Sequence, residues 1–401
     1  MGAARRESLT AHRQPAADRA ASQARESPRT GLILTGGGAR AAYQVGVLLA
    51  VAKLSKNRRR NPFPILCGTS AGAINAASIA CLADNFSKAV SILAGVWRNM
   101  RAHDIYRADP LGVGLSGMRW ISLLALGWLI HNPPNSLLDN APLQALLTRH
   151  LDFKGVQRSI DKGALHALCI STSGYESGEN INFFQAHHDA QPWRRVQRVG
   201  IRAQIGVEHL LASSAIPFVF PAARIHREFF GDGSMRQLAP ISPAIHLGAE
   251  RVLIIGASRK NEHQDRRSVD SHPSLAQIAG HALSSIFLDS LAVDIERMQR
   301  INQTLSAIPQ DIRIQSGIPL RPIKTLIISP SERLDRIAAE HASALPWAIK
   351  ALLGGVGAMN RHGGALTSYL LFEKPYTCAL IDLGYADTMA RDNEVGEFLQ
   401  L

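Results

Sequence analysis

The pentapeptide at residues 68–72 restricts the fold of this chain more than any other feature, because Gly68 and Gly72 flank Ser70 in a Gly-x-Ser-x-Gly pattern. An apolar run at 63–67 reads as a buried strand before it, and small residues at 73–82 have the composition of a helix after it. On so sharp a turn the serine backbone is strained and only small neighbours fit. The pattern predicts a serine nucleophile, although a small-residue turn without chemistry has the same composition.

A second turn of this kind lies about thirty residues earlier. A strand at 32–35 is followed by three glycines and then by helical spacing at 39–54. The glycines are Gly36, Gly37 and Gly38. Their consecutive backbone N–H groups carry no side chains in front of them, so the loop is suited to bind a phosphate or to stabilise an oxyanion.

The surrounding residues discriminate between these two uses of the loop. A dinucleotide fold needs an acidic residue about 20 positions on, and the stretch at 55–60 holds only Ser, Lys, Asn and Arg. A P-loop is excluded because no Gly-Lys-Ser/Thr follows the glycines. The loop therefore predicts an oxyanion hole for Ser70, with Arg40 as an additional positive charge nearby.

A serine nucleophile needs a base, and Asp232 is the best candidate. It stands between Gly231 and Gly233 after the apolar strand predicted at 228–230. A plain surface turn has the same Asp-Gly signature, but the two phenylalanines before it favour a carboxylate that emerges from a buried strand.

A Ser-His-Asp triad is the alternative arrangement. Many histidines follow Ser70, but none lies in a glycine-flanked loop after the acid, as the order Ser, Asp, His requires. His246 and His281 are the best placed of them. Each is expected far more often on a helix surface or in a core than in a catalytic site.

Strands that alternate with helices along the chain predict an α/β layered structure with a mostly parallel sheet. Further strands are expected at 165–171, 181–185, 228–230, 252–255 and 324–328, and helices at 85–100, 141–150 and 203–214. The predicted organisation is a disordered polar tail at 1–30, a catalytic domain at 31–288 with an apolar insertion near 111–130, and a mainly helical extension at 289–401.

Composition limits the partners. The formal net charge is +12 and the pI is near 10.0, which favours an anionic partner. The basic residues are scattered without an aromatic-interleaved stripe, so a membrane surface is favoured over nucleic acid. The apolar run at 120–130, with Trp120 and Trp128, is too short to span a bilayer. It is expected to be a lid, a docking helix or a buried helix.

The cysteines and the N-terminus indicate the compartment. The four cysteines are far apart and lack metal-ligand spacing, so no metal or other cofactor is predicted and a reducing compartment is favoured. Because the first 30 residues contain no apolar signal core, a cytoplasmic protein is expected, with peripheral contact at the inner membrane. Unconventional export is left open.

With the glycine loop, the serine turn and Asp232-Gly233 in this order, the chain resembles the patatin-like phospholipases. The segment at 212–221 and the residues at 240–241 and 248–252 extend the likeness, which covers about 31–257. Ala41 and Ser234 depart from the family pattern, which usually has glycine at the first position and glycine or alanine at the second.

The resemblance implies a three-layer α/β sandwich and a lipid acyl hydrolase that works through a Ser70–Asp232 dyad and an acyl-enzyme. Asp232 would accept the Ser70 proton, and the amides of residues 36–38 would hold the oxyanion. Phospholipids or lysophospholipids are the implied substrates. An esterase or thioesterase with a full triad, and a non-catalytic lipid-binding protein on the same fold, remain as alternatives. Head-group preference and oligomeric state do not follow from the sequence.

Overall fold

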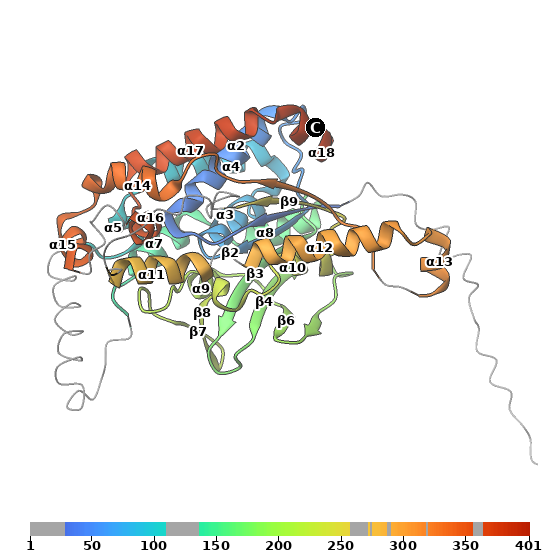
Figure 1. The fold of residues 1–401 in the computed structure, drawn as a ribbon, viewed down its shortest axis with the longest axis horizontal. Coiled ribbons are helices and arrows are strands. Elements are labelled where there is room, and N and C mark those ends of the chain that lie inside the picture. Colours follow the sequence, from blue (N-terminus) through green and yellow to red (C-terminus); the bar gives the residue numbers. More distant parts are fainter. Residues whose placement is uncertain are drawn as a thin grey trace, which may run out of the picture.

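The computed structural model describes residues 29–109, 136–256, 272, 275–286, 290–317, 320–355 and 364–401. A mixed sheet of ten strands forms its centre (Figure 1). The strands are β1 (Thr30–Leu34), β2 (Ile65–Thr69), β3 (Ala167–Gly174), β4 (Asn180–Ala186), β5 (Trp193–Arg195), β6 (Arg198–Arg202), β7 (Ala223–Ile225), β8 (Glu228–Asp232), β9 (Arg251–Ile255) and β10 (Lys324–Ile328).

Helices connect these strands and continue to the C-terminus. They are α2 (Ala42–Leu54), α3 (Ala71–Ala80), α4 (Phe86–Asn99), α5 (Ala102–Ile105), α7 (Ala141–His150), α8 (Lys154–Asp161), α9 (Val207–Ser213), α10 (Ser242–His246), α11 (Leu275–Ser284), α12 (Ser290–Ser306), α13 (Gln310–Gln315), α14 (Leu334–His341), α15 (Trp347–Gly355), α16 (Gly364–Leu370), α17 (Lys374–Met389) and α18 (Asp392–Leu399). Short 3₁₀ helices include η1 (Gly38–Ala41), η2 (Ala83–Asn85), η4 (Gly233–Arg236) and η7 (Ala342–Ala344).

Five neighbouring strands, in the order β10-β9-β1-β2-β3, run parallel. The sheet continues from β3 through β4 and β6 to β5, and β4 is antiparallel to β3. A second antiparallel partner, β8, pairs with the last residues of β3. The carboxyl ends of β1 and β2 therefore lie at one edge of the sheet, which is where α/β proteins bind ligands.

Both faces of the parallel strands are buried. Leu32, Leu34 and Leu66 pack with the helices α2, α3, α4 and α17 on one face, whereas Ile33 and Ile65 pack with α10 and α12 on the other. Figure 1 shows α2, α4 and α17 together along one side of the sheet and α10 and α12 on the other. Burial on both faces explains why β1 and β2 read as continuous apolar runs. The predicted α/β sandwich with a mostly parallel sheet is confirmed.

Most predicted elements agree with the structure within a few residues. The helix at 141–150 and the strand at 324–328 have the observed bounds, whereas the helix predicted at 203–214 begins only at Val207. Gly206 is its N-cap in an extended conformation, so the chain before it is not helical. The short strands β5, β6 and β7 were not predicted, because each is only partly buried and lacks a long apolar run.

The C-terminal region is mainly helical, as predicted, and it is joined closely to the rest of the fold. Strand β10 extends the sheet beyond β9, and α17 lies along α2. The division at residue 288 stays a prediction. The polar tail at 1–28 and the apolar insertion at 111–130, including Trp120 and Trp128, lie outside the described residues.

Across the described segments, no single helix has the length and apolar composition of a membrane span. One pair, Ala71–Ala80 with Ala83–Asn99, passes that test together, but it is bent by 73°. Most of the first helix of this pair is buried in the core.

The contact between α2 and α17 generates a test of the fold. A Cβ at Gly46 would overlap the carbonyl oxygen of Ile381, and one at Gly384 would overlap that of Tyr43. We expect Gly46→Ala to lower the free energy of unfolding by about 2–3 kcal/mol. Gly95→Ala is the matched control in α4, where a Cβ meets nothing within 4 Å, and should raise stability by about 0.5–1 kcal/mol. Equal denaturation midpoints would contradict the close packing of these helices.

Candidate active site

Ser70 occupies the strained turn that the sequence predicts. Its backbone has φ 55° and ψ −131°, a conformation that side-chain-bearing residues rarely adopt. A Cβ at Gly68 would lie 2.5 Å from the Ala73 Cα atom, and one at Gly72 would overlap the Leu34 carbonyl oxygen. Both glycines are thus required, because α3 meets β2 at Gly68 and the end of β1 at Gly72 with no room for side chains.

Two buried hydrogen bonds hold this turn in place. The Ser70 amide donates to Ser213 Oγ at 2.8 Å, and Ser213 Oγ donates to the Ser171 carbonyl oxygen at 2.7 Å. Ser213 is the last residue of α9 and is fully buried. It therefore connects the turn to β3. The sequence contains no local signal for this role, because Ser213 lies 143 positions after Ser70.

The sheet brings Asp232 to Ser70. On one side of β3, β2 ends with Thr69 opposite Ser171, and β8 begins its pairing at the next position with Asp232 opposite Thr172. The other side of β3 is already filled by β4 along this stretch. The strand β8 consequently continues the row of β2 along β3, and the two strands meet end to end where Ser70 follows Thr69.

Burial determines the acidity of Asp232, whose side chain is fully enclosed. Desolvation raises the pKa of its carboxyl to about 6, and the neighbouring Ser70 side chain and the Ser234 amide oppose this by favouring the charged form. Oδ1 accepts from the Ser234 amide at 2.9 Å. Oδ2 is buried without a hydrogen bond of normal geometry to any described residue. This oxygen therefore has free capacity to accept a proton.

The glycine loop borders the same cavity through one of its three residues. Gly38 lines the cavity together with Ser70, whereas Gly36 and Gly37 are buried beside it without lining it. Gly38 has φ 54°, and a Cβ there would overlap the Tyr369 carbonyl oxygen. Because Gly38 starts the 3₁₀ helix η1, its amide belongs to the first turn, whose N–H groups have no partner within the helix.

A buried polar chain fixes the loop relative to α3. Asn75 donates to the Ala41 carbonyl oxygen at 3.2 Å and to Gln44 Oε1 at 2.9 Å, and Gln44 donates to the Thr35 carbonyl oxygen at 2.8 Å. Trp97 Nε1 in turn donates to Asn75 Oδ1 at 2.8 Å. This chain of hydrogen bonds holds both ends of the loop to α3, the helix that follows Ser70, and sequence reasoning did not find it.

Arg40 does not take the predicted place at the oxyanion site. Its Nε donates to Ser368 Oγ at 2.8 Å, and its guanidinium lies over the Tyr369 ring, 4.2 Å from the centroid. The side chain is directed at α16 because these partners satisfy a buried cation there. Arg40 thus attaches the loop to the C-terminal region.

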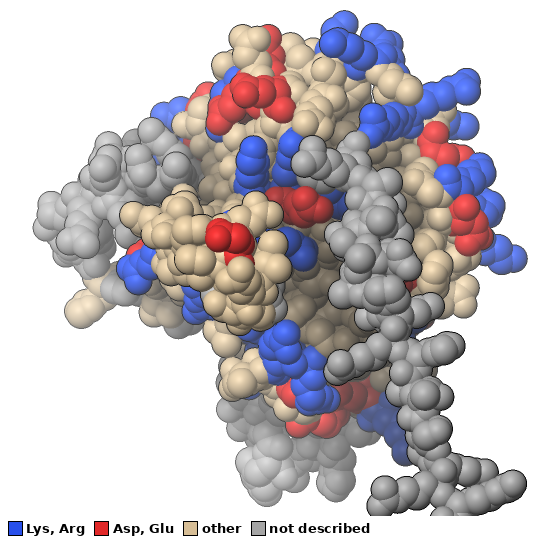
Figure 2. Space-filling model, turned by 90° about the vertical axis from the view of Figure 1, so that its right-hand side faces the viewer, with Lys and Arg blue, Asp and Glu red and all other residues tan. Residues whose placement is uncertain are grey.

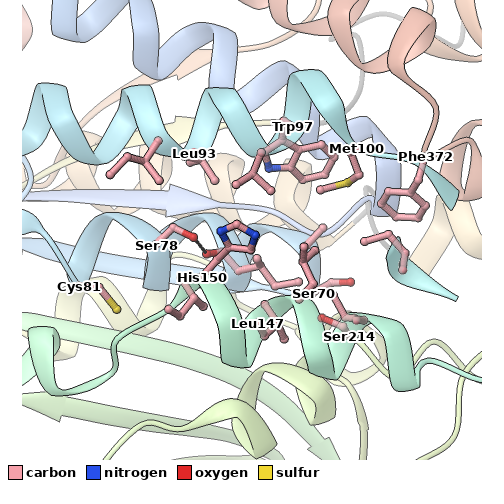
Figure 3. A pocket seen from close by; sticks show the side chains of 18 of the residues that line it. Ser70, Ser78, Cys81, Leu93, Trp97, Met100, Leu147, His150, Ser214 and Phe372 are labelled. Carbon is pink, nitrogen blue, oxygen red and sulfur yellow. Dashed lines mark hydrogen bonds between the residues drawn. The ribbon is translucent and has the colours of Figure 1, made fainter. Parts of the chain in front are cut away.

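The cavity that contains Ser70 is mostly apolar. It has a volume of about 170 Å³ and lies between α3, α4 and α7. Figure 3 shows Ser70 and Ser214 at one end with Met100 and Phe372, and Cys81 at the other end. Such a cavity suits a hydrocarbon chain attached to a group that reacts at Ser70.

The histidines considered for a triad lie elsewhere. The His246 ring stacks on Trp193 with centroids 4.9 Å apart, within the packing on the face opposite α3, and burial lowers its pKa to about 4. His281 is exposed on α11. His150 lines the cavity but lies beside Ser78 and away from Ser70 (Figure 3). In the described ranges, no histidine hydrogen-bonds to Ser70 or Asp232.

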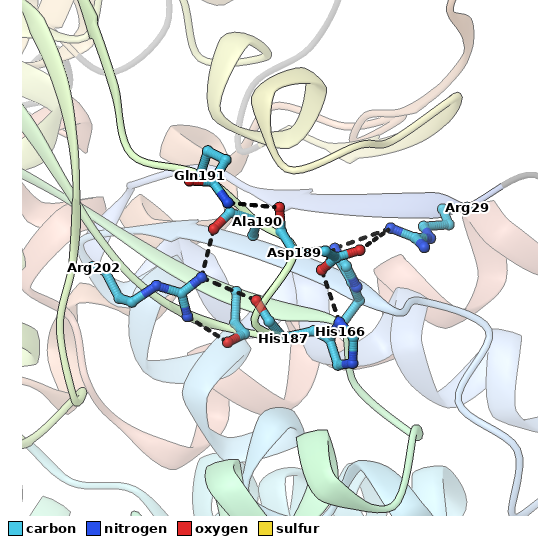
Figure 4. A network of polar contacts seen from close by, with 8 residues as sticks. Arg29, His166, His187, Asp189, Ala190, Gln191 and Arg202 are labelled. Carbon is cyan, nitrogen blue, oxygen red and sulfur yellow. Dashed lines mark hydrogen bonds and ion pairs between the residues drawn. The ribbon is translucent and has the colours of Figure 1, made fainter. Parts of the chain in front are cut away.

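Figure 4 shows a group of potential metal ligands outside this site. His166, His187 and Asp189 place their ligand atoms within 4.8 Å of one another. The group lies where β3 begins and β4 ends, at the opposite edge of the sheet from Ser70. Arg29 NH1 is 3.1 Å from His166 Nε2 and 3.7 Å from Asp189 Oδ2, so a cationic side chain already neutralises this group.

Comparison with known proteins identifies the family. The model for patatin-like phospholipases matches residues 32–245, more than half of the chain. A cGAMP-activated phospholipase from Pseudomonas aeruginosa is 26% identical over 211 residues, which are 52% of this chain and 53% of that protein. The chain thus spans about half the length of this relative.

A crystal structure of VipD from Legionella pneumophila aligns with 89% of this chain and 67% of its own, at 12% identity and a TM-score of 0.32, a resemblance too distant to inform the fold. The range that matches the family model includes the glycine loop, Ser70 and Asp232. This protein therefore belongs to the patatin-like phospholipase family, whose members are lipid hydrolases.

Proposed function

We propose that this protein hydrolyses carboxylic esters of phospholipids or lysophospholipids, with Ser70 as the nucleophile and Asp232 as the general base. The observation that carries the proposal is the end-to-end meeting of β2 and β8 along β3, which places both residues in one buried site. Membership of the family supports phospholipase activity, and the apolar cavity at Ser70 supports an acyl substrate.

In the proposed mechanism, Asp232 accepts the hydroxyl proton while Ser70 Oγ attacks the ester carbonyl carbon. The amide of Gly38, together with the loop amides at Gly36 and Gly37, stabilises the negative charge on the carbonyl oxygen. The tetrahedral intermediate expels the alcohol, which takes up the proton, and leaves an acyl-enzyme on Ser70. Water then attacks the acyl-enzyme, with Asp232 again as the base, and releases the fatty acid.

The environment of Asp232 makes it a stronger base than an ordinary carboxylate. Its pKa of about 6 lies near neutral pH, so it is charged under physiological conditions and still has appreciable proton affinity. Such a base can act without a histidine between it and the serine. The free Oδ2 atom is the atom we assign to proton transfer.

We also propose that the protein acts in the cytoplasm in peripheral contact with an anionic membrane surface. The net charge of +12 supports long-range attraction to acidic head groups, and four free cysteines are compatible with a reducing compartment. On the face shown in Figure 2, Lys and Arg side chains form separate groups with acidic side chains between them. Because charge alone does not select a docking face there, we assign the contact to the apolar run at 120–130.

The nucleophile is tested with a fluorophosphonate label. Ser70→Ala and Ser70→Gly should both lose labelling, and ester hydrolysis should fall on the order of 10⁴-fold. The glycine variant should be more stable than the alanine variant by about 1 kcal/mol, because only glycine adopts φ 55° without strain. Wild-type labelling of either variant would refute Ser70 as the nucleophile. A wild-type protein that takes no label would also refute it and would support a non-catalytic lipid-binding protein.

The base is tested by the pH dependence of hydrolysis. Because Asp232 must be charged to accept a proton, kcat/KM should fall about tenfold per pH unit below a pKa of about 6. Asp232→Asn should be inactive at every pH. A pH profile that stays flat down to pH 5 would exclude Asp232 as the base, and loss of activity on replacing a single histidine would instead support a triad.

The raised pKa of Asp232 also predicts how the stability of the fold depends on pH. The folded-state pKa is raised from 3.8 to about 6, so the folded protein binds the proton more tightly than the unfolded chain. The associated stabilisation is complete below pH 4 and is lost as pH rises through 6. At pH 8, Asp232→Asn should therefore unfold at the same or a higher denaturant concentration than the wild type, despite being inactive.

Membrane contact is tested by sedimentation with lipid vesicles. Binding to vesicles that contain anionic lipid should exceed binding to neutral vesicles and should weaken as salt is raised. Replacing Trp120 and Trp128 together by Ser should reduce binding about tenfold or more. Trp347→Ser, at a position that is 68% exposed on α15, is the matched control. Unchanged binding of the double variant would refute the assignment of the contact to 120–130.

A further inference from the structure

We propose that the cavity at Ser70 is a channel for a single acyl chain that runs along α3 from Ser70 to Cys81, and that the side chains at 78 and 81 set the chain length that the enzyme accepts. This inference rests on the proposed hydrolysis of acyl esters at Ser70 and specifies which acyl chains are preferred.

The floor of the channel is one face of α3. Ala71, Ile74, Ser78 and Cys81 line the cavity, and they follow one another at intervals of three or four residues. This spacing places them in one row along the helix. The row starts next to Ser70, so an acyl group bound to Ser70 Oγ can continue directly over it.

The walls come from α4 and α7. Leu93, Val96 and Trp97 of α4 line the cavity together with Met100, which directly follows this helix. On α7, the lining residues are Leu143, Leu146, Leu147 and His150. Figure 3 shows Trp97 and Met100 near the Ser70 end and Leu93 nearer Cys81. Leu147 lies on the opposite wall, lower in this view. Apart from His150 beside Ser78 and the polar groups at the two ends, the walls offer hydrocarbon surface.

The length of the floor gives the length of the chain. Cys81 is eleven positions after Ser70, which corresponds to about 16 Å along a helix. An extended chain advances about 1.2 Å per bond, as the polypeptide backbone does, so about 13 bonds reach from Ser70 to Cys81. Ser78, eight positions after Ser70, is reached after about 12 Å or ten bonds.

The far end differs chemically from the floor. Asp152 and Arg158 line the cavity there and form an ion pair with 2.6 Å between carboxylate oxygen and guanidinium nitrogen, and both side chains are more than half exposed. The Cys81 thiol beside them is buried, and burial raises its pKa to about 12, so it stays uncharged. Apolar burial therefore ends near Cys81, and any longer chain meets charged groups and water.

The test measures kcat/KM for p-nitrophenyl esters of 4 to 16 carbons. For the wild type, each methylene that enters the channel should raise kcat/KM about fourfold, and the rise should stop near 12–14 carbons. Ser78→Phe should shift the break to about 8–10 carbons and lower the ratio of 14-carbon to 4-carbon activity at least tenfold. Cys81→Trp should affect only chains longer than about 12 carbons.

The matched control is Ser91→Phe, which makes the same change on the exposed face of α4 and should leave the chain-length profile as in the wild type. Labelling of Ser70 by a short-chain fluorophosphonate and thermal melting show whether each variant folds. If the Ser78→Phe variant does not fold, Ser78→Leu replaces it in the test and should produce a smaller shift in the same direction.

The channel is refuted if folded Ser78 and Cys81 variants lose activity equally at every chain length or keep the wild-type profile. If the wild-type protein neither takes the label nor hydrolyses any ester, the proposed function itself fails. The two failures are therefore distinguishable.

Discussion

The structure of the site depends on the absence of space between α3 and the strands β1 and β2. Gly68 and Gly72 permit the contact, and the turn that results forces Ser70 into a backbone conformation that is unfavourable for any residue with a side chain. The surrounding fold compensates for this strain with directed contacts. Ser213 holds the Ser70 amide and is itself held by β3, so the position of Ser70 is determined by the sheet and not by the turn alone.

The same strand, β3, also determines the surroundings of Asp232. Since β2 and β8 occupy consecutive positions along it, Asp232 reaches the site from the interior of the sheet and loses its contact with water. Burial makes its charged form unfavourable and so gives the carboxylate the proton affinity that a base requires. In a triad a histidine supplies this affinity at neutral pH, whereas in this site desolvation would supply it. As a consequence, the folded protein is less stable at neutral pH, where Asp232 is charged, than at a pH where it is protonated.

The sequence was informative wherever a property depends on neighbouring residues. The turn at Ser70, the bounds of α7 and β10, and the emergence of Asp232 from a buried strand all follow from local patterns of glycine and apolar residues. Contacts between distant residues were not predictable in this way. Arg40 binds Ser368, 328 positions away, and a single sequence contains no local signal for that pairing. The roles of Ser213 and of the Asn75 chain were missed for the same reason.

The small-residue composition of α3 has two separate explanations on its two sides. Toward the sheet, Gly72 and Ala73 are small because the helix and the strands β1 and β2 are in close contact. Toward the cavity, Ser78 and Cys81 are also small, although they line a cavity and are not pressed against the sheet. A larger side chain there would fill the cavity and bury more apolar surface, which would favour the folded state. Small residues at these positions leave the space above them open to a ligand, and the proposed hydrocarbon chain of an acyl group at Ser70 would match the apolar lining of that space.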